Sequence, residues 1–298
     1  MRLPFFFTRA TEITSVNDTT PLSGTGIWKI EFAFDNEQTA TQTSSPTGTG
    51  WKQWGGNDLI GVYEGFCTNS SDNTSGNLLS ISGKTPTPSI QTKNFIAKAS
   101  NQGTGFSIVK WRHHCIMAIL FYSYYGHTNC QALLGLGPSS ATGTGSTNSY
   151  GMKDSTDNAG KNYTINFWGL ENWWGNCSEF MTGISITRET WTVIDDSGNT
   201  RTVTGSSSYG AWYYPSKWVI GENLDIVPLP GQSGGNATSG YCDGVYVDSD
   251  NSARSVSRSR WTNQSQGGVG FIGAADHANY AANRIGSRLS YTGDIEIV

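Results

Sequence analysis

Short runs in which hydrophobic and polar residues alternate are frequent in the N-terminal part of the chain. Between clusters of glycine, proline, serine and threonine lie the runs Ile27–Phe34, Leu59–Phe66, Leu78–Ile81 and Asn94–Ala97. Because the side chains of a strand point alternately to its two faces, this period of two predicts β-strands. The polar stretches Thr39–Gly50 and Thr68–Asn77 predict exposed loops, with pairing along the axis of a trimeric fibre as the alternative.

A helical period occurs in the segment Phe106–Tyr125. Its apolar stripe is formed by Ile108, Trp111, Cys115, Ile119 and Tyr122. Further apolar residues beside the stripe predict a helix that is buried on more than one side. Gly126 predicts the end of this helix, and Asn129–Gly135 predicts a second short element before a long polar loop.

Short strands return in the C-terminal part of the chain. They are predicted at Tyr163–Trp168, Met181–Ile186, Glu189–Asp195, Thr200–Thr204, Lys217–Ile220, Gly270–Ile272 and Ile285–Tyr291. The Asp-Ser-Gly-Asn sequence at 196–199 predicts a hairpin turn, since glycine and asparagine tolerate positive φ. The pattern indicates an α+β protein with few helices, short strands and long loops.

Composition narrows the class of protein. Charged residues make up 14% of the 298 residues, against roughly 25% in an ordinary soluble domain. The formal net charge of -4 argues against binding driven by neutralisation of nucleic-acid phosphates. Hydrophobic residues make up 36% of the chain, and 11 residues are tryptophan. The chain can therefore build a sizeable core, which excludes intrinsic disorder.

The sequence contains only weak signals for membrane insertion, for secretion and for a role of its cysteines. No apolar run approaches the length needed to cross a bilayer, so no membrane insertion is expected. The apolar region around Phe5–Phe7 is too short for a secretory signal and lacks a small-residue cleavage site. The cysteines are Cys67, Cys115, Cys130, Cys177 and Cys242, whose scattered spacing predicts buried or free thiols rather than a zinc site or a disulfide framework.

The most distinctive segment is Asn166–Phe180, which is rich in tryptophan, glycine, asparagine and glutamate. Gly169 and Gly175 permit backbone turns that a Cβ would disfavour, and polar side chains can bind loop amides beneath covering rings. We therefore predict a structural core built from loop, whose members are Trp168, Glu171, Asn172, Trp173, Trp174 and Asn176.

The order of these residues resembles a known family. Gly169-Leu170-Glu171-Asn172, Gly175-Asn176 and Glu179-Phe180 resemble the Gly-Asn-x-x-Glu-Trp signature of the formylglycine-generating-enzyme-like branch of the C-type lectin fold. Ile285–Leu289 resembles the strand that closes that fold, and the segments Arg258–Trp261 and Gly267-Gly268 resemble its Arg-Gly-Gly-Ser-Trp region in a different order.

The wider pattern is similar to proteins of gut-bacterial phages and Bacteroides-associated surface proteins that use this fold for display, including variable proteins of diversity-generating retroelements. Three further segments carry this resemblance: Tyr125–Gly135, Thr147–Met152 and Leu224–Pro228. The resemblance covers about residues 100–298. It implies a C-type-lectin-like ligand-binding domain at 101–298. The composition of residues 1–100 predicts a β-rich attachment or support region before that domain.

Some members of the family are enzymes, so we tested the catalytic sets on this chain. The copper-dependent oxidases use a pair of thiols near the C-terminal end, and here no cysteine follows Cys242. The iron-dependent relatives need three histidines, but the histidines here are His113, His114, His127 and His277, the first two adjacent on the predicted helix. Adjacent helical residues point about 100° apart and cannot face one metal together, which favours a structural role for that pair.

In the display branch the segment before the closing strand forms the ligand face. The equivalent residues here are Arg260, Trp261, Asn263, Gln264, Asp276, His277, Asn279, Tyr280 and Asn283. Aromatic side chains supply rigid contact area and polar ones supply adaptable hydrogen bonds, a combination that suits a glycan. The alternative is that each is an ordinary polar loop residue.

A calcium site is the one cofactor that the sequence suggests. Asp243, Asp248, Asp250 and Asn251 place oxygen ligands close together in the sequence, although the spacing is not that of an EF-hand loop. A solvated acidic loop is the alternative.

Together these features predict a non-enzymatic receptor-binding protein (adhesin) of a phage tail or virion surface, acting outside the cell. The expected partners are a bacterial surface ligand, glycan or protein, other virion tail proteins, and further copies of the chain, with a trimer as the specific oligomer considered. The alternatives are a bacterial fimbrial or secreted lectin-like adhesin and a metal-dependent oxidoreductase of the formylglycine-generating type.

Overall fold

The computed structural model describes residues 5–13, 27–35, 51–54, 58–139, 142–150, 154, 163–167, 169–195, 197–205, 210–220, 226–228, 234–236, 240–261 and 266–292. The described part is mostly β, with three helices between many short strands. This agrees with the predicted class of few helices, short strands and long loops.

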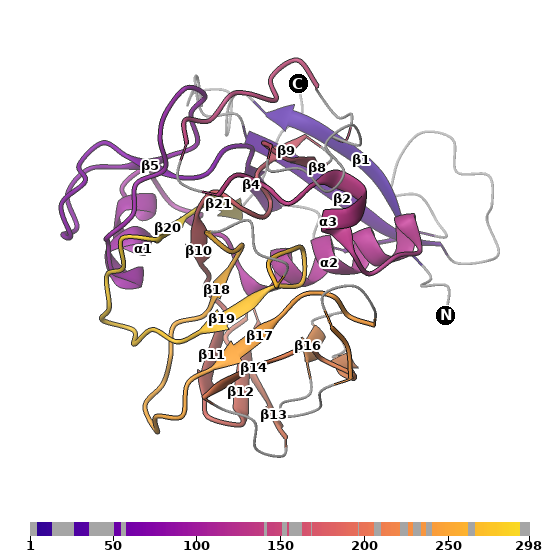
Figure 1. Ribbon diagram of the computed structural model, residues 1–298. Helices are drawn as coiled ribbons and strands as arrows, with labels where there is room; N and C mark the ends of the chain where they lie inside the picture. Colours follow the sequence, from indigo (N-terminus) through magenta and orange to yellow (C-terminus); the bar gives the residue numbers. More distant parts are fainter. Residues whose placement is uncertain are drawn as a thin grey trace.

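One six-stranded sheet joins the two ends of the chain. Its order is β1 (Phe5–Ile13), β2 (Ile27–Asp35), β4 (Asp58–Gly61), β21 (Leu289–Thr292) and β7 (Phe106–Ile108), with β3 (Trp51–Trp54) paired to β2 (Figure 1). Strand β21 lies between β4 and β7 and pairs with both in antiparallel register. The sheet therefore combines strands from both sides of residue 100. The division of the chain into a support region at 1–100 and a ligand-binding domain at 101–298 remains a prediction.

A second six-stranded sheet lies in the C-terminal part. Its order is β14 (Ala211–Tyr213), β17 (Val245–Val247), β19 (Ile272–Ala274), β18 (Ser257–Arg258), β10 (Ser178–Phe180) and β20 (Ile285–Ser287). The pairs β17–β19 and β10–β20 are parallel and the other pairs are antiparallel. The single strand predicted at 285–291 is in fact two strands, β20 and β21, which belong to different sheets and are separated by Arg288.

Four smaller sheets complete the strands. They are β11 (Ile184–Thr187) with β12 (Thr190–Ile194) and β13 (Thr200–Thr204); β15 (Trp218–Ile220) with β16 (Ile226–Pro228); β5 (Phe66–Cys67) with β6 (Leu78–Leu79); and β8 (Asn166–Phe167) with β9 (Leu170–Glu171). The predicted hairpin at β12–β13 is confirmed. The Asp195 carboxylate accepts hydrogen bonds from the Ser197 and Asn199 amides, and Gly198 has φ +81°.

Two predictions for the segments that form helices need correction. The strand predicted at Asn94–Ala97 is wrong, because helix α1 (Thr92–Ser100) occupies that segment with Phe95, Lys98 and Ala99 buried at helical spacing. The helix predicted at Phe106–Tyr125 begins only at Trp111, as α2 (Trp111–Tyr125), since Phe106–Ile108 forms β7 with alternating burial. Gly126 ends α2 in the left-handed conformation, as predicted, and α3 (Cys130–Leu134) is the second short element.

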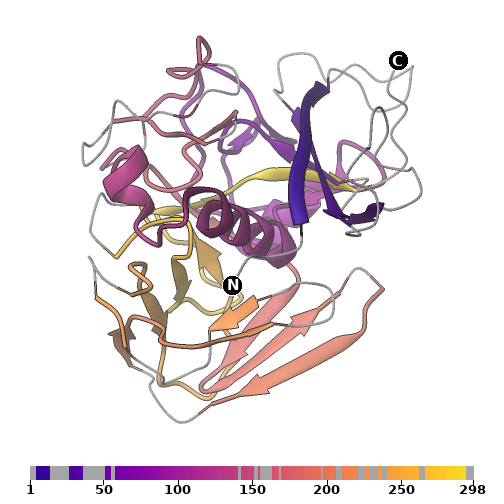
Figure 2. The same cartoon turned by 90° about the vertical axis from the view of Figure 1, so that its right-hand side faces the viewer.

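The main hydrophobic core surrounds α2, which crosses the middle of the molecule in Figures 1 and 2. The fully buried rings Trp111, Trp173, Trp174 and Trp191 belong to this core. A second cluster, which includes Leu59, Phe95 and Leu289, lies where α1 meets the first sheet. The loops at the surface are thereby held by a core rich in large aromatic side chains.

The segment Asn166–Phe180 lies in this core, where its polar side chains bind the backbone. Glu171 accepts hydrogen bonds from the amides of Gly145 and Thr147, at 2.8 and 2.9 Å, and Asn176 accepts one from the Thr142 amide. Asn172 and Asn176 both have positive φ and both donate to the buried Glu64 carboxylate. Of the predicted core residues, Trp168 lies outside the described part of the chain.

Candidate ligand-binding face

The outer face of strands β14, β17 and β19 carries aromatic side chains. Trp212 on β14 is opposite Tyr246 on β17, and Tyr246 is in turn opposite Gly273 on β19. The neighbouring residues on these strands, Tyr213, Val245, Val247, Ile272 and Ala274, are buried. Because side chains alternate across a strand, Trp212 and Tyr246 lie on the face turned away from the core.

Glycines leave room for the rings on this face. The Trp212 ring lies 5.2 Å from the Tyr246 ring and 5.6 Å from the Phe271 ring, measured between centroids. A Cβ on Gly273 would lie 3.4 Å from the Phe271 ring, and a Cβ on Gly244 would lie 3.2 Å from the Trp212 ring. Both positions would be crowded by a side chain, so the glycines allow the rings to lie close to the sheet.

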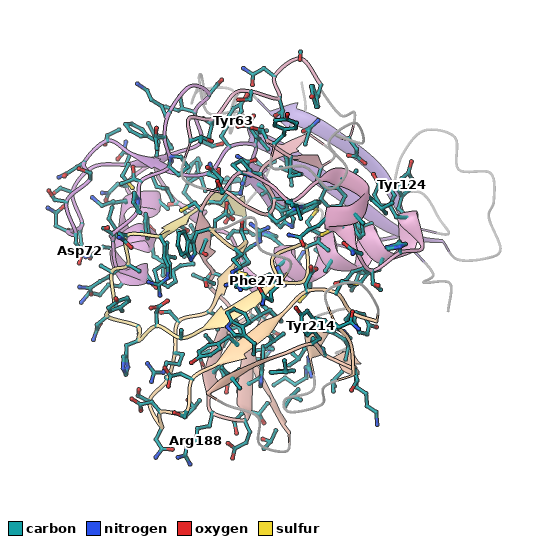
Figure 3. The ribbon with its side chains drawn as sticks, viewed as in Figure 1. Tyr63, Asp72, Tyr124, Arg188, Tyr214 and Phe271 are labelled. Carbon is teal, nitrogen blue, oxygen red and sulfur yellow. The ribbon has the colours of Figure 1, made fainter. Side chains whose placement is uncertain are left out.

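Arg260 lies over the rings of Trp212 and Phe271 and completes what we call the aromatic platform, defined as Trp212, Tyr246, Phe271 and Arg260. Its guanidinium carbon is 4.5 Å from the centroid of the Trp212 ring and 5.8 Å from that of Phe271. Partial burial lowers the pKa of Arg260, against an opposing effect of Tyr214. Figure 3 shows Phe271 and Tyr214 near the ribbons of β17 and β19. The platform therefore exposes Trp212, at 40%, and part of Tyr246, with one cation stacked on Trp212, while Phe271 is buried.

A second group, the Arg254 cluster, contains Arg254, Asp248, Asp250, Ser252 and His277. The buried Arg254 guanidinium lies 3.5 Å from the Asp248 carboxylate and 3.0 Å from that of Asp250. His277 Nδ1 lies 3.0 Å from Ser252 Oγ, and His277 Nε2 lies 3.7 Å from the Asp250 carboxylate. These contacts bring the turn after β19 against the turn after β17.

The predicted ligand residues fall at both ends of β19. Arg260 belongs to the platform, where Phe271 precedes the strand, and Asp276 and His277 follow the strand. Three residues of strand span about 10 Å, which is the separation of the two groups along β19. Asp276 is 3.2 Å from Arg284 and its pKa is raised, chiefly by burial.

The remaining predicted ligand residues are exposed where they are described. Trp261 and Tyr280 are 41% and 46% exposed, and Asn279 and Asn283 are exposed as well. The Tyr280 amide donates to the His277 carbonyl oxygen at 2.8 Å, which forms the turn between them. Asn263 and Gln264 lie outside the described residues.

The three aspartates of the calcium prediction do not meet in one place. Asp243 precedes β17 and is buried, with its carboxylate 2.7 Å from the Gly270 amide that donates to it, whereas Asp248 and Asp250 follow β17 and contact Arg254. Across the described residues, no group of three or more His, Cys, Asp or Glu side chains is arranged to hold a metal ion. Burial raises the pKa of Asp243 to about 8, so this carboxyl group is mostly protonated at neutral pH.

The adjacent histidines lie inside the core. The Lys110 amide donates to His113 Nδ1 at 3.2 Å at the start of α2. His114 is buried against the Trp111 ring, and burial together with the charge of Arg258 holds its pKa well below the usual range. Both positions are 1% exposed, which fits the structural role expected for the pair.

The thiols are also buried. Burial has the largest effect on the pKa of the Cys67 thiol, which is raised to about 11. Burial also raises the pKa values of Cys130, Cys177 and Cys242. A thiol that stays protonated is a poor nucleophile, so these groups are unsuited to covalent chemistry at neutral pH.

Trp212 and Tyr246 were missed as candidate ligand residues. The structure shows alternating burial around Tyr246, which lies between the buried Val245 and Val247, whereas in Gly210–Tyr213 only Tyr213 is buried. Both strands are only three residues long, which is too short for a pattern in the sequence to distinguish a strand from a loop.

The fold and the site define a mostly β protein with an aromatic face. Comparisons with known proteins add little to this description. No protein-family model and no curated protein matches the chain. Among solved structures, a chain described as "Major Tropism Determinant P3c Variant" matches with 12% sequence identity and a TM-score of 0.37. The match covers 81% of this chain and 52% of that one, so this chain spans about half the length of the matched structure. In the described residues, no helix is long and apolar enough to cross a membrane.

Proposed function

We propose that the protein is a non-enzymatic receptor-binding protein of a phage tail or virion surface, and that its C-terminal C-type-lectin-like region binds a ligand on a bacterial surface. The observation that carries this proposal is the face formed by the aromatic platform and the exposed residues Trp261 and Tyr280. Exposed aromatic rings beside polar side chains on short, firmly packed strands favour recognition of an external ligand.

The chemistry of the described residues supports binding rather than catalysis. The histidines of α2 and the cysteines are buried in the core, and the exposed His277 belongs to the Arg254 cluster. Tail attachment and self-association of the chain, including a trimer, are part of the same proposal.

The direct test is attachment of the purified protein to host cells. The double substitution Trp261→Ala with Tyr280→Ala is expected to reduce attachment at least tenfold, because two exposed rings near the face are lost. Tyr124→Ala is the matched control, since Tyr124 is 69% exposed on α2 and lies well apart from Phe271 in Figure 3. Attachment that is unchanged in the folded double variant would refute the placement of the ligand face.

The location of the native protein separates the proposal from its alternatives. Antibody labelling should find the protein on purified virions. Labelling of fimbriae or of the bacterial surface in uninfected cells would favour the lectin-like adhesin instead. Stoichiometric copper or iron in the purified protein would favour the oxidoreductase of the formylglycine-generating type.

A further inference from the structure

The segment that carries Tyr280 leaves strand β19 and returns to the core just before β20. We call residues 276–284 the Tyr280 loop. Its exposed residues include Asn279 and Tyr280, both among the predicted ligand residues. We propose that Arg254 is a positioning residue that holds this loop in the conformation that binds the receptor. This inference rests on the proposed receptor-binding function and names a residue that sets the shape of its ligand face.

The Arg254 side chain connects two turns through one planar group. Its Nη2 lies 3.0 Å from the Asp250 carboxylate and 3.5 Å from the Asp248 carboxylate, both in the turn after β17. Its Nη1 donates to the carbonyl oxygen of Ala275, directly after β19, at 3.2 Å. Because the two nitrogens belong to one rigid guanidinium, these contacts fix the start of the Tyr280 loop relative to the turn after β17.

The backbone at Arg254 adds a second connection. The Arg254 amide donates to the carbonyl oxygen of Ile186 on β11 at 2.8 Å, and the Ser255 amide donates to the Asp276 carbonyl oxygen at 3.0 Å. Antiparallel β-bridges join Arg254 to Ile186 on one side and to His277 on the other. The Tyr280 loop therefore begins beside a segment that is itself paired with β11.

Burial of the Arg254 side chain shields its contacts from solvent. This side chain is 2% exposed, whereas those of Asp248 and Asp250 are 31% and 46% exposed. A buried charge is screened by salt and water much less than a surface ion pair. When Arg254 is replaced, the two carboxylates keep access to water, but the Ala275 carbonyl oxygen loses this donor. The main loss therefore falls on the start of the Tyr280 loop.

The far end of the loop is held by contacts that do not involve Arg254. Arg284 Nη2 lies 3.2 Å from the Asp276 carboxylate, so an ion pair connects the two ends of the loop. The Ser89 amide donates to the carbonyl oxygen of the buried Ala282 at 3.0 Å. Replacing Arg254 should therefore loosen the start of the loop while its end stays attached to the core, which changes the position of the exposed side chains and preserves the fold.

Order in the loop before binding raises the affinity for the receptor. A loop that is already fixed loses less conformational entropy when its ligand arrives. If only a fraction of the molecules hold the loop in the binding conformation, the apparent affinity falls by that fraction. Arg254 thus acts on binding through the Tyr280 loop and needs no contact with the ligand. Its replacement should change the affinity and leave the amount bound at saturation unchanged.

Amide hydrogen exchange tests whether Arg254 orders the loop. Arg254→Met removes the donors and keeps most of the side-chain length. We expect exchange at residues 276–281 to become about tenfold faster, with exchange in β10 unchanged. Arg254→Lys keeps the charge but lacks the fork, so it should give a smaller increase, and it replaces the methionine variant if that variant does not fold.

Arg201→Met is the matched control for this measurement, because Arg201 lies on β13, in the sheet formed by β11, β12 and β13. Near-UV circular dichroism checks the fold of each variant. Exchange in the Tyr280 loop that is unchanged in the Arg254 variants, or that is equally fast in Arg201→Met, would overturn the proposal.

Attachment to host cells tests the role of the loop in binding. For Arg254→Met we expect the half-saturating concentration to rise about tenfold at an unchanged saturating level. In a Tyr280→Ala background the same substitution should raise it by at most about twofold, because both changes act through one loop. Additive effects, or a lower saturating level at an unchanged half-saturating concentration, would contradict the positioning role.

The two measurements separate this inference from the proposed function. Normal attachment of Arg254→Met despite faster exchange in the loop refutes the positioning role and keeps the receptor-binding function. Wild-type protein that does not attach to host cells refutes the receptor-binding function and, with it, the role of Arg254 in binding. The exchange measurement then still decides whether Arg254 orders the loop.

Discussion

At the scale of single residues, Trp173 shows how the core combines rings with charge. Two buried arginines lie near its ring, with the guanidinium carbon of Arg258 3.6 Å and that of Arg288 5.5 Å from the ring centroid. Both arginines pair with Glu179, and Arg288 also donates to backbone carbonyl oxygens of residues 61, 62, 171 and 172. The two buried arginines share the Glu179 carboxylate, and the carbonyl oxygens around Arg288 further stabilise its charge.

Trp173→Ala is expected to destabilise the protein by about 3–5 kcal/mol, since it removes a fully buried ring and leaves a cavity beside two charges. Trp261→Ala removes an exposed ring and should change the free energy of unfolding by less than about 1 kcal/mol. Both values can be measured by chemical denaturation followed by fluorescence. Similar losses for the two variants would contradict the structural role of Trp173.

The sequence predicted burial of Trp173 but could not predict the arginines around it. The composition of Asn166–Phe180 indicates a local core of rings and amides. Arg258 and Arg288 are far along the chain, and their approach depends on the pairing of β10 with β18 and β20. Contacts of this kind are set by tertiary structure and leave no periodic signal.

At the scale of elements, α1 holds a loop that the sequence predicted to be simply exposed. The Lys98 side chain is fully buried, and its ammonium group donates to the carbonyl oxygens of Asn69, at 2.9 Å, and Ser75. Asn101 donates to the carbonyl oxygens of Thr74 and Gly76. The side chains of residues 68–77 are mostly exposed, but the backbone is bound to the helix. Because Lys98 occupies a buried position of α1, the apolar residues of the helix do not show a helical period in the sequence. The pattern there predicts a strand instead.

Lys98→Met should loosen this loop, because the carbonyl oxygens lose their buried donor while the length of the side chain is kept. We expect faster amide hydrogen exchange at residues 68–77 and a loss of roughly 1–3 kcal/mol in stability. Lys93→Met on the same helix is the control, as Lys93 is exposed. Equal exchange in the two variants would show that Lys98 does not hold the loop.

At the scale of the whole molecule, buried carboxyl groups in separate regions make stability depend on pH. The pKa of Glu64 is raised to about 8, first by burial and then by Glu179, against the effects of Arg288 and the two asparagines. The pKa of Asp243 is raised to about 8 by burial, against the Gly270 hydrogen bond. For both groups the pKa in the folded protein lies above the pKa in the unfolded chain. At pH values between these two pKa values, the folded protein therefore binds more protons than the unfolded chain.

The free energy of unfolding should therefore fall as pH rises from about 5 to about 8, because stability present below the unfolded pKa is lost as the folded pKa is passed. The double variant Glu64→Gln with Asp243→Asn should flatten this dependence, whereas Glu189→Gln on the turn between β11 and β12 should leave it unchanged. Denaturation at several pH values measures the slope. A slope that is equally steep in the double variant would rule out these groups as its source.

The division of the closing segment into β20 and β21 has a consequence for how the protein is made. Residues 285–292 pair with β10, β4 and β7, so both large sheets stay incomplete until this segment leaves the ribosome. Until then, the edges of β4, β7 and β10 are open to any suitable strand. The same segment of a neighbouring nascent chain has the matching sequence, so copies translated close together on one messenger can exchange it. Chaperones that shield open strand edges during synthesis would therefore increase the yield of correctly closed protein.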